Sequence, residues 1–157
     1  MPSVGATENA LLAACGAEGT TVIYNAAREP EIVDLQEMLI KMGAEVCGAG
    51  GSIITVKGGG KLHGCVHRVI GDRIVAATYL CAVAAVGGEA RLLGVDYRTL
   101  SMTALALVES GCVVESQNDT VTIRSDGRLR AIRPIRTAPY PGFPTDAQPV
   151  LVAALLK

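Results

Sequence analysis

One carboxylate in this sequence has a local setting suited to acid–base chemistry. Asp146 follows the proline-rich stretch Pro139 to Pro144 and lies in the tetrapeptide Thr145 to Gln148, which has the spacing of a capping box. The prolines predict a stiff extended loop, and the capping box predicts a last helix that begins after it. In the first turn of a helix the macrodipole favours a charged acid, so Asp146 is a candidate weak base. Alternatively, Asp146 only stabilises the helix, by about 0.3–1 kcal/mol.

A second candidate site lies where the chain begins. Ser3, Val4 and Gly5 precede an apolar stretch that predicts a helix from Glu8 to Ala17, with Thr7 as its N-cap. A small residue and exposed backbone amides ahead of a helix can bind an anion. The alternative is that these residues form an ordinary helix cap.

The sequence predicts neither a metal site nor a cofactor site. His63, Cys65 and His67 alternate, which would place them on one side of a strand, but no fourth ligand and no paired Cys-x-x-Cys accompanies them. Gly58 to Gly60 lacks the Lys-Ser/Thr of a phosphate-binding P-loop and is interpreted as a turn.

Two further charged groups remain open between a binding role and a structural one. Arg28, Glu29 and Glu31 could line a cleft, but acids also suit the positive end of a helix, and we interpret them as structural. A cluster of arginines could bind phosphate or form a solvated face: Arg124, Arg128, Arg130, Arg133 and Arg136.

Composition excludes several classes of protein. The chain has 157 residues, 14 Lys plus Arg against 15 Asp plus Glu, and 3% aromatic residues, which argues against nucleic-acid binding by charge or stacking. A mean hydropathy of +0.38 excludes disorder. The most apolar run, residues 74–86, is shorter than the roughly 20 residues of a membrane span, and no signal-peptide pattern opens the chain. The five cysteines are scattered, as in reduced cytoplasmic proteins.

Helix and strand patterns alternate along the chain and repeat once. Gly43 and Gly111, 68 positions apart, each end a helix and precede a hairpin, so we infer a duplicated βαβαββ-type unit of the α/β (α+β) class. The expected helices are 8–17, 30–43, 73–86 (capped by Asp72), 97–110 and 145–156. The expected strands are 21–24, 45–47, 52–57, 89–93, 112–115 and 120–124.

Both ends of the chain are abrupt. Ser3 to Gly5 lies directly behind the first methionine, and the last helix ends in the wholly apolar stretch Val150 to Leu156 without a stop signal. We expect the chain to be a piece of a longer protein.

Four stretches together resemble the UDP-N-acetylglucosamine 1-carboxyvinyltransferases, a family of enolpyruvyl transferases. The stretches are Pro2 to Asn9, Ala27 to Leu35, Asp72 to Ile74 and Pro139 to Asp146. The resemblance implies two domains, each of three βαβαββ units in an inside-out α/β barrel. Residues 1–68 would be the last unit of the first domain. Residues 69–157 would be the first unit and the start of the next unit of the second domain, with a hinge near Ile70 to Arg73.

The resemblance also implies a reaction of peptidoglycan synthesis. The family transfers enolpyruvate from phosphoenolpyruvate to the 3-hydroxyl of UDP-N-acetylglucosamine. Asp146 would face that hydroxyl across a cleft between two lobes, and Ser3, Val4 and Gly5 would hold the diphosphate. The substrates would be the partners, with no nucleic acid, membrane, metal or cofactor.

Two features separate this chain from the family pattern. The cysteine that serves the family as an acid lies on a Gly-rich loop outside this chain, so we expect no activity from the isolated chain. Four residues depart from the family shortly after two of the matching stretches: Val75, Ala77, Ala147 and Pro149. An alternative is a non-catalytic module of two repeat units that binds a nucleotide sugar or associates with itself through open sheet edges.

Overall fold

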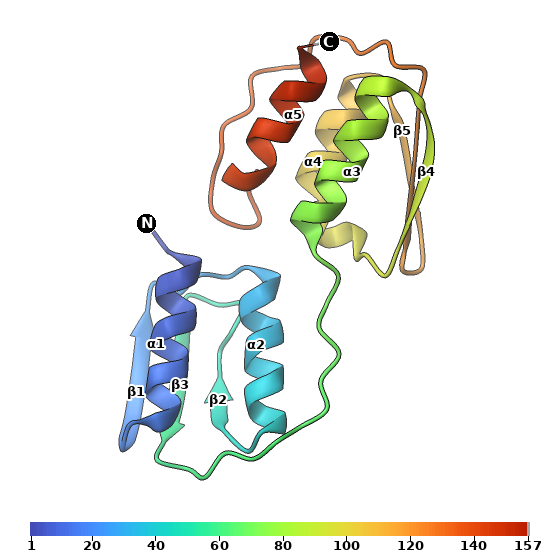
Figure 1. Cartoon of the computed structure of the whole chain (residues 1–157). Helices are drawn as coiled ribbons and strands as arrows, with labels where there is room; N and C mark the ends of the chain where they lie inside the picture. The colour runs from blue at the N-terminus through green and yellow to red at the C-terminus, as the bar shows by residue number, and fades with distance from the viewer. Residues whose placement is uncertain (157) are drawn as a thin grey trace. The chain divides into compact units, whose positions relative to one another are not determined.

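The computed structural model describes residues 1–156 and divides the chain into two compact units. The first unit is Met1–Val69, and the second begins at Ile70 (Figure 1). The correspondence of these units to parts of two family domains stays a prediction.

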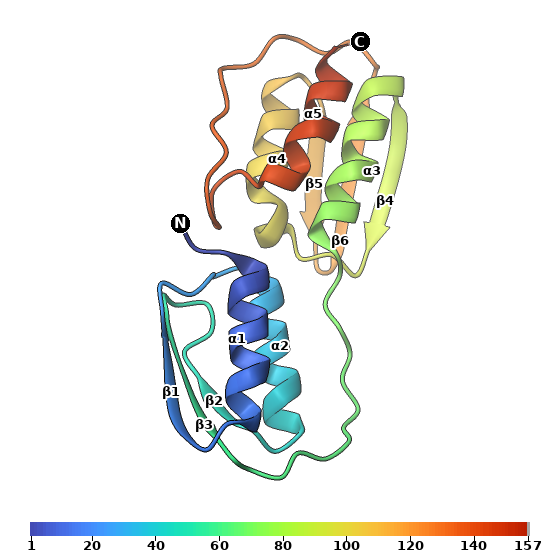
Figure 2. The same cartoon turned by 60° about the vertical axis from the view of Figure 1, so that its left-hand side comes forward.

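The first unit is a three-stranded antiparallel sheet with two helices on one face. Its strand order is β1-β3-β2, and Val22 pairs with Thr55 while Val46 pairs with Val56. Figures 1 and 2 show both helices side by side on the same face of the sheet. The elements are α1 (Val4–Gly16), β1 (Gly19–Tyr24), α2 (Pro30–Lys41), β2 (Glu45–Cys47) and β3 (Ile53–Gly58).

The second unit repeats this order and adds a helix. Its sheet order, β4-β6-β5, matches that of the first unit, which confirms the duplication inferred from the sequence. Figure 2 shows α5 beside α3 and α4. The elements are α3 (Arg73–Val86), β4 (Gly88–Leu93), α4 (Tyr97–Glu109), β5 (Val113–Gln117), β6 (Thr120–Ser125), the 3-10 helix η1 (Thr145–Ala147) and α5 (Gln148–Leu155). In residues 1–156 each unit shows the order αβαββ, without the leading strand of the expected βαβαββ.

Strand alternation determines the core of each unit. Ile54 and Val56 of β3 point to the helices and are fully buried, and so are Val121 and Ile123 of β6. Their neighbours along the strand, such as Lys57 and Arg124, face solvent. Burying each such aliphatic side chain contributes about 1.5–3 kcal/mol to folding.

Three local predictions are wrong. Helix α1 begins at Val4 with Ser3 as its N-cap, so Thr7 lies inside the helix. The capping box does not form, because Thr145 begins η1 and neither η1 nor α5 has a side-chain cap. Residues 59–72 form no strand, so His63, Cys65 and His67 do not line a strand face.

Two of the sequence departures have a clear structural setting. Pro149 occupies the first turn of α5, where its missing N–H costs no helical hydrogen bond. Ala77 is buried in the core, where its methyl group fits between helices, whereas Val75 is half exposed.

Candidate functional site

The start of α1 has the features of an anion site. The N-cap Ser3 accepts a hydrogen bond at Oγ from the amide of Ala6 at 3.4 Å. The amides of Val4 and Gly5 lie in the first turn, where an α-helix has no internal acceptor for N–H groups. Ser3 and Gly5 are exposed, and a Cβ at Gly5 would meet no atom within 4 Å. Accessible donors at the positive end of the helix suit a phosphate group.

A buried hydroxyl connects this helix start to the segment before α2. Thr7 Oγ1 donates to the carbonyl of Ser3 at 2.8 Å and accepts from the amide of Ala27 at 3.0 Å. Thr7 is 4% exposed, so both bonds lie away from water. The hydroxyl therefore fixes Ser3 against the loop that leads into α2. This role of Thr7 could not be predicted from the sequence, because the second bond joins residues 20 positions apart.

Glu29, which the sequence analysis interpreted as structural, has a setting in the first unit that also suits ligand binding. It is 9% exposed and precedes α2 without capping it. Its Oε2 has no hydrogen-bond partner within residues 1–156. Burying a carboxylate oxygen without a hydrogen-bond donor costs about 1–3 kcal/mol of folding free energy. A bound ligand that supplies the donor would remove this cost. Glu31 instead lies in the first turn of α2, as the structural interpretation expected, and Arg28 is exposed.

Asp146 lies in the second unit, in the middle of η1. Phe143 and Ala147 on either side are buried at 1% and 0% exposure. The amide of Ala147 also bonds to the carbonyl of Pro144 at 3.2 Å. The backbone at Asp146 is therefore held in place while its side chain is exposed and accessible to a ligand. That this carboxylate faces a sugar hydroxyl stays a prediction.

The loop before Asp146 is a closed turn, which corrects the expected extended conformation. The amide of Gly142 donates to Pro139 at 2.8 Å, and the amide of Ala138 donates to Phe143 at 3.0 Å. A Cβ at Gly142 would lie 2.6 Å from the Ala138 side chain, so the turn requires glycine there. Prolines restrict φ, but the buried ring of Phe143 and the glycine decide that the chain turns back.

Aromatic packing joins this loop to α3. The guanidinium of Arg73, the first residue of α3, lies 5.6 Å from the centre of the Tyr140 ring. Arg73 is 9% exposed, so this cation–π contact is largely shielded from water. The contact helps to hold the loop that leads to Asp146 against α3.

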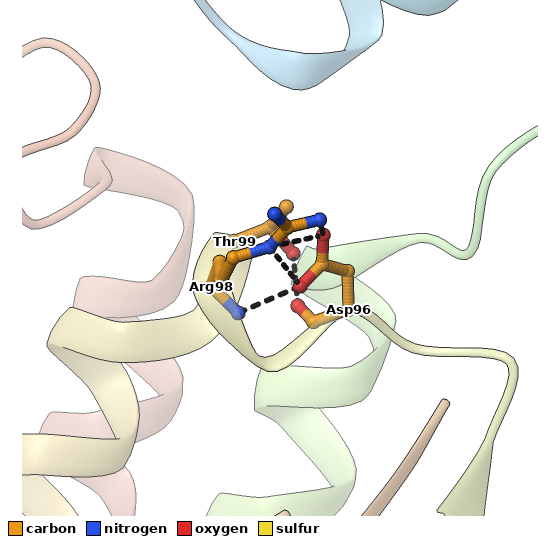
Figure 3. Close-up of polar contacts among 3 residues, drawn as sticks. All are labelled: Asp96, Arg98 and Thr99. Atoms are coloured by element: carbon orange, nitrogen blue, oxygen red, sulfur yellow. Dashed lines mark hydrogen bonds and ion pairs between the residues drawn. The ribbon is translucent and has the colours of Figure 1, made fainter. Parts of the chain in front are cut away.

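A carboxylate begins α4 in the same unit. Figure 3 shows Asp96 accepting bonds from the amide of Arg98 at 2.9 Å and from its guanidinium at 2.7 Å, while Thr99 Oγ1 donates to the Asp96 carbonyl. Hydrogen bonds from Arg98 lower the pKa of Asp96, and the same pair raises the pKa of Arg98. Both charges are already paired, so this group serves the helix start.

Replacing Asp96 by Ala should lower the free energy of unfolding by about 1 kcal/mol at neutral pH, the value of a lost N-cap. Because the pKa of Asp96 is lowered by folding, its contribution is present above the ordinary carboxyl pKa and disappears as pH falls through the lowered one. Urea unfolding followed by circular dichroism at neutral pH and in strong acid measures the difference.

Arg98→Ala is the control, since it removes an exposed ion pair worth less than about 1 kcal/mol and leaves the cap. An equal loss for Asp96→Ala at both pH values would contradict this account.

The buried cysteines are poor candidates for acid–base work. Burial raises the pKa of Cys81 to about 12, with a smaller contribution from nearby Cys112, and also raises the pKa of Cys15. A thiol with a raised pKa does not lose its proton readily at neutral pH.

The arginine cluster is partly neutralised. Arg124 bonds to Glu89 at 3.0 Å and to Glu115 at 3.1 Å, and Arg133 bonds to Glu109 at 3.0 Å. These pairs favour the solvated-face interpretation over a phosphate site. Within residues 1–156, no three metal-binding side chains come together, and no helix is long and apolar enough to cross a membrane.

Comparison with protein families decides the affiliation. The model of the family "EPSP synthase (3-phosphoshikimate 1-carboxyvinyltransferase)" matches residues 1–156. The chain belongs to the EPSP synthase family. Membership in this family of enolpyruvyl transferases agrees with the resemblance drawn from the four sequence stretches.

Curated relatives of the chain share one name. A UDP-N-acetylglucosamine 1-carboxyvinyltransferase from Symbiobacterium thermophilum is 52% identical over 97% of this chain, and one from Nocardia farcinica is 50% identical over 96%. One from Caldanaerobacter subterraneus is 49% identical over 99%. The chain spans 34–37% of the length of these relatives.

The solved structure of an enolpyruvyl transferase supports the fold. The enolpyruvyl transferase NikO from Streptomyces tendae matches 96% of this chain and 36% of its own, with a TM-score of 0.75 and 27% identity. The α/β repeat fold expected from the sequence is therefore confirmed.

Proposed function

We propose that this chain is part of a UDP-N-acetylglucosamine 1-carboxyvinyltransferase. The observation that carries the proposal is 49–52% identity over nearly the whole chain with three proteins of that name. The reaction would join the 3-hydroxyl oxygen of the sugar to C2 of phosphoenolpyruvate while the enol CH₂ gains a proton. Loss of phosphate and of one methyl proton would then leave the enol ether.

In this proposal Asp146 accepts the proton of the sugar hydroxyl. Its exposed carboxylate on a backbone held by Phe143 and Ala147 supports the role, because a general base needs both access to the hydroxyl and a fixed position. The tightly turned loop before it, anchored by the buried Phe143, limits the positions that the carboxylate can take.

The start of α1 would hold the diphosphate of the sugar nucleotide. The free first-turn amides of Val4 and Gly5 and the exposed Ser3 support this role. Glu29, with its unpartnered buried oxygen, would accept a hydrogen bond from an uncharged donor of the same ligand, since a carboxylate repels phosphate.

The isolated chain should release no phosphate from phosphoenolpyruvate and UDP-N-acetylglucosamine above background. The physical reason is that the reaction needs an acid for the enol CH₂, and the family's cysteine loop lies outside this chain. A colorimetric phosphate assay measures the outcome, with one of the 49–52% identical relatives as the positive control. Turnover by the chain would contradict the expected division of catalytic groups.

A self-associating module is the second candidate, and exposed apolar side chains on the helices favour it. Val75 and Tyr79 of α3 and Leu105 and Val108 of α4 are 47–60% exposed. Exposed apolar side chains that lie together often mark a surface that binds another protein. A module of this kind would not support turnover when it replaces the matching part of a complete enzyme. Turnover in such a chimera therefore distinguishes the two candidates.

A further inference from the structure

The segment that joins the two units begins as a strap along α2. The amide of His63 donates to the carbonyl of Met42 at 2.9 Å, just beyond the end of α2, and Cys65 Sγ lies 3.9 Å from the carbonyl of Met38. We use "strap" for Lys61 to His67. Although the strap has no regular secondary structure, it follows α2 from its end toward its middle.

His67 ends the strap in a polar cluster that is partly buried. Its Nε2 lies 3.0 Å from Asp34 Oδ1, and the two side chains are 5% and 12% exposed. Its Nδ1 lies 3.1 Å from Lys41 Nζ. Asp34 and Lys41 both belong to α2, so one imidazole ring contacts two points of the same helix.

The partners of the ring determine its protonation pattern. A lysine ammonium can only donate, so Nδ1 must be the acceptor of the Lys41 bond. Nε2 therefore carries the proton and donates it to the carboxylate of Asp34. Both ring nitrogens of His67 are therefore bonded to charged partners, Nδ1 to Lys41 and Nε2 to Asp34.

The other end of the connection belongs to the second unit. Asp72 Oδ1 accepts bonds from the amides of Ile74 and Val75 at 2.8 and 2.9 Å and so begins α3. Gly71 lies against Gly94, whose carbonyl a Cβ at Gly71 would strike. Between these two anchors Val69 and Ile70 are 69% and 42% exposed, and Arg68 is exposed as well.

We propose that His67 fastens the connection to the first unit, so that the part of the connection between the two anchors is Arg68 to Ile70. This inference does not depend on the proposed function, because it uses only contacts inside each unit. It also moves the hinge expected near Ile70 to Arg73 toward the N-terminus, since Gly71 and Asp72 are anchored to the second unit.

Nitrogen-15 NMR of the full 157-residue chain tests the ring directly. The expected spectrum at neutral pH shows His67 as a single Nε2–H tautomer. An averaged signal, or a proton on Nδ1, would overturn the proposal, because Lys41 and Asp34 would then not hold the ring as described. This measurement needs no variant, so it stands even if a substitution disturbs folding.

Limited trypsin digestion tests the fastening. His67→Ala should speed cleavage after Arg68 by about tenfold or more, because trypsin must also bind the residues before Arg68 and the hydrogen bonds of His67 hold those residues against α2. His63→Ala is the matched control: it lies in the same strap but is exposed, and cleavage should stay close to that of the unchanged chain.

Asp34→Asn provides a milder variant that keeps an acceptor for Nε2–H. It should accelerate cleavage less than His67→Ala, with the circular dichroism spectrum of the chain preserved. Equal cleavage rates for His67→Ala and the unchanged chain would overturn the proposal. Faster cleavage at every site of the first unit would overturn it too, since His67 would then support the unit as a whole.

Discussion

Asp146→Asn should lower turnover by about 10²–10⁴-fold in an enzyme that depends on this carboxylate as its base. The test uses a chimera in which residues 1–156 replace the matching third of the relative from Caldanaerobacter subterraneus, which is 49% identical to this chain. Asparagine has nearly the shape of aspartate and keeps the η1 backbone, but it cannot accept the proton of the sugar hydroxyl. Steady-state phosphate release measures kcat and KM.

The control in the chimera is Asp126→Asn. Asp126 is also exposed and in the second unit, but its Oδ1 only accepts a turn bond from the amide of Arg128. It should leave kcat unchanged. If Asp146→Asn retains full kcat in an active chimera, Asp146 is only a first-turn acid of its helix. An inactive but folded chimera would instead favour the self-associating module.

Phe143→Ala should destabilise the second unit by about 3–5 kcal/mol, the usual cost of removing a buried aromatic ring. Phe143 is 1% exposed and belongs to the core formed by α3, α4, α5 and β6. Its carbonyl also accepts the bond from Ala138 that closes the proline-rich turn. Urea unfolding followed by circular dichroism gives the change in the free energy of unfolding.

Leu105→Ala is the control for Phe143→Ala, since Leu105 is 57% exposed on α4 and its loss leaves no cavity. Its expected effect lies within about 0.5 kcal/mol. A Phe143→Ala chain as stable as the Leu105→Ala chain would contradict the assignment of Phe143 to the core. In the chimera, Phe143→Ala should also lower kcat, because the ring holds the backbone that carries Asp146.

The elements with strong local signals could be predicted from the sequence. Asp72 caps α3 and Pro30 begins α2 at the predicted residues, since a capping oxygen and a fixed φ act on neighbours in the chain. Alternating β-branched residues predicted β3 and β6 within one or two residues. The duplication followed from these signals because each unit uses them in the same order.

The candidate site was only partly predictable. Ser3, Val4, Gly5 and Asp146 could be named from the sequence through the resemblance to enolpyruvyl transferases, and their roles stay predictions. Glu29 was taken as a helix-start acid, because a sequence does not tell how deeply a carboxylate is buried or whether its oxygens find donors. The closed turn before Asp146 was missed for a similar reason, since prolines restrict the backbone without setting its direction.

The sequence by itself determined the family and the repeated order of helices and strands. These depend on periodicity and on interactions over a few residues. Only the tertiary structure decided that Thr7 bonds to Ala27 rather than capping α1, and that His67 meets Asp34, 33 positions away. A hydroxyl or an imidazole can serve several partners equally well, and the packing of distant segments selects among them.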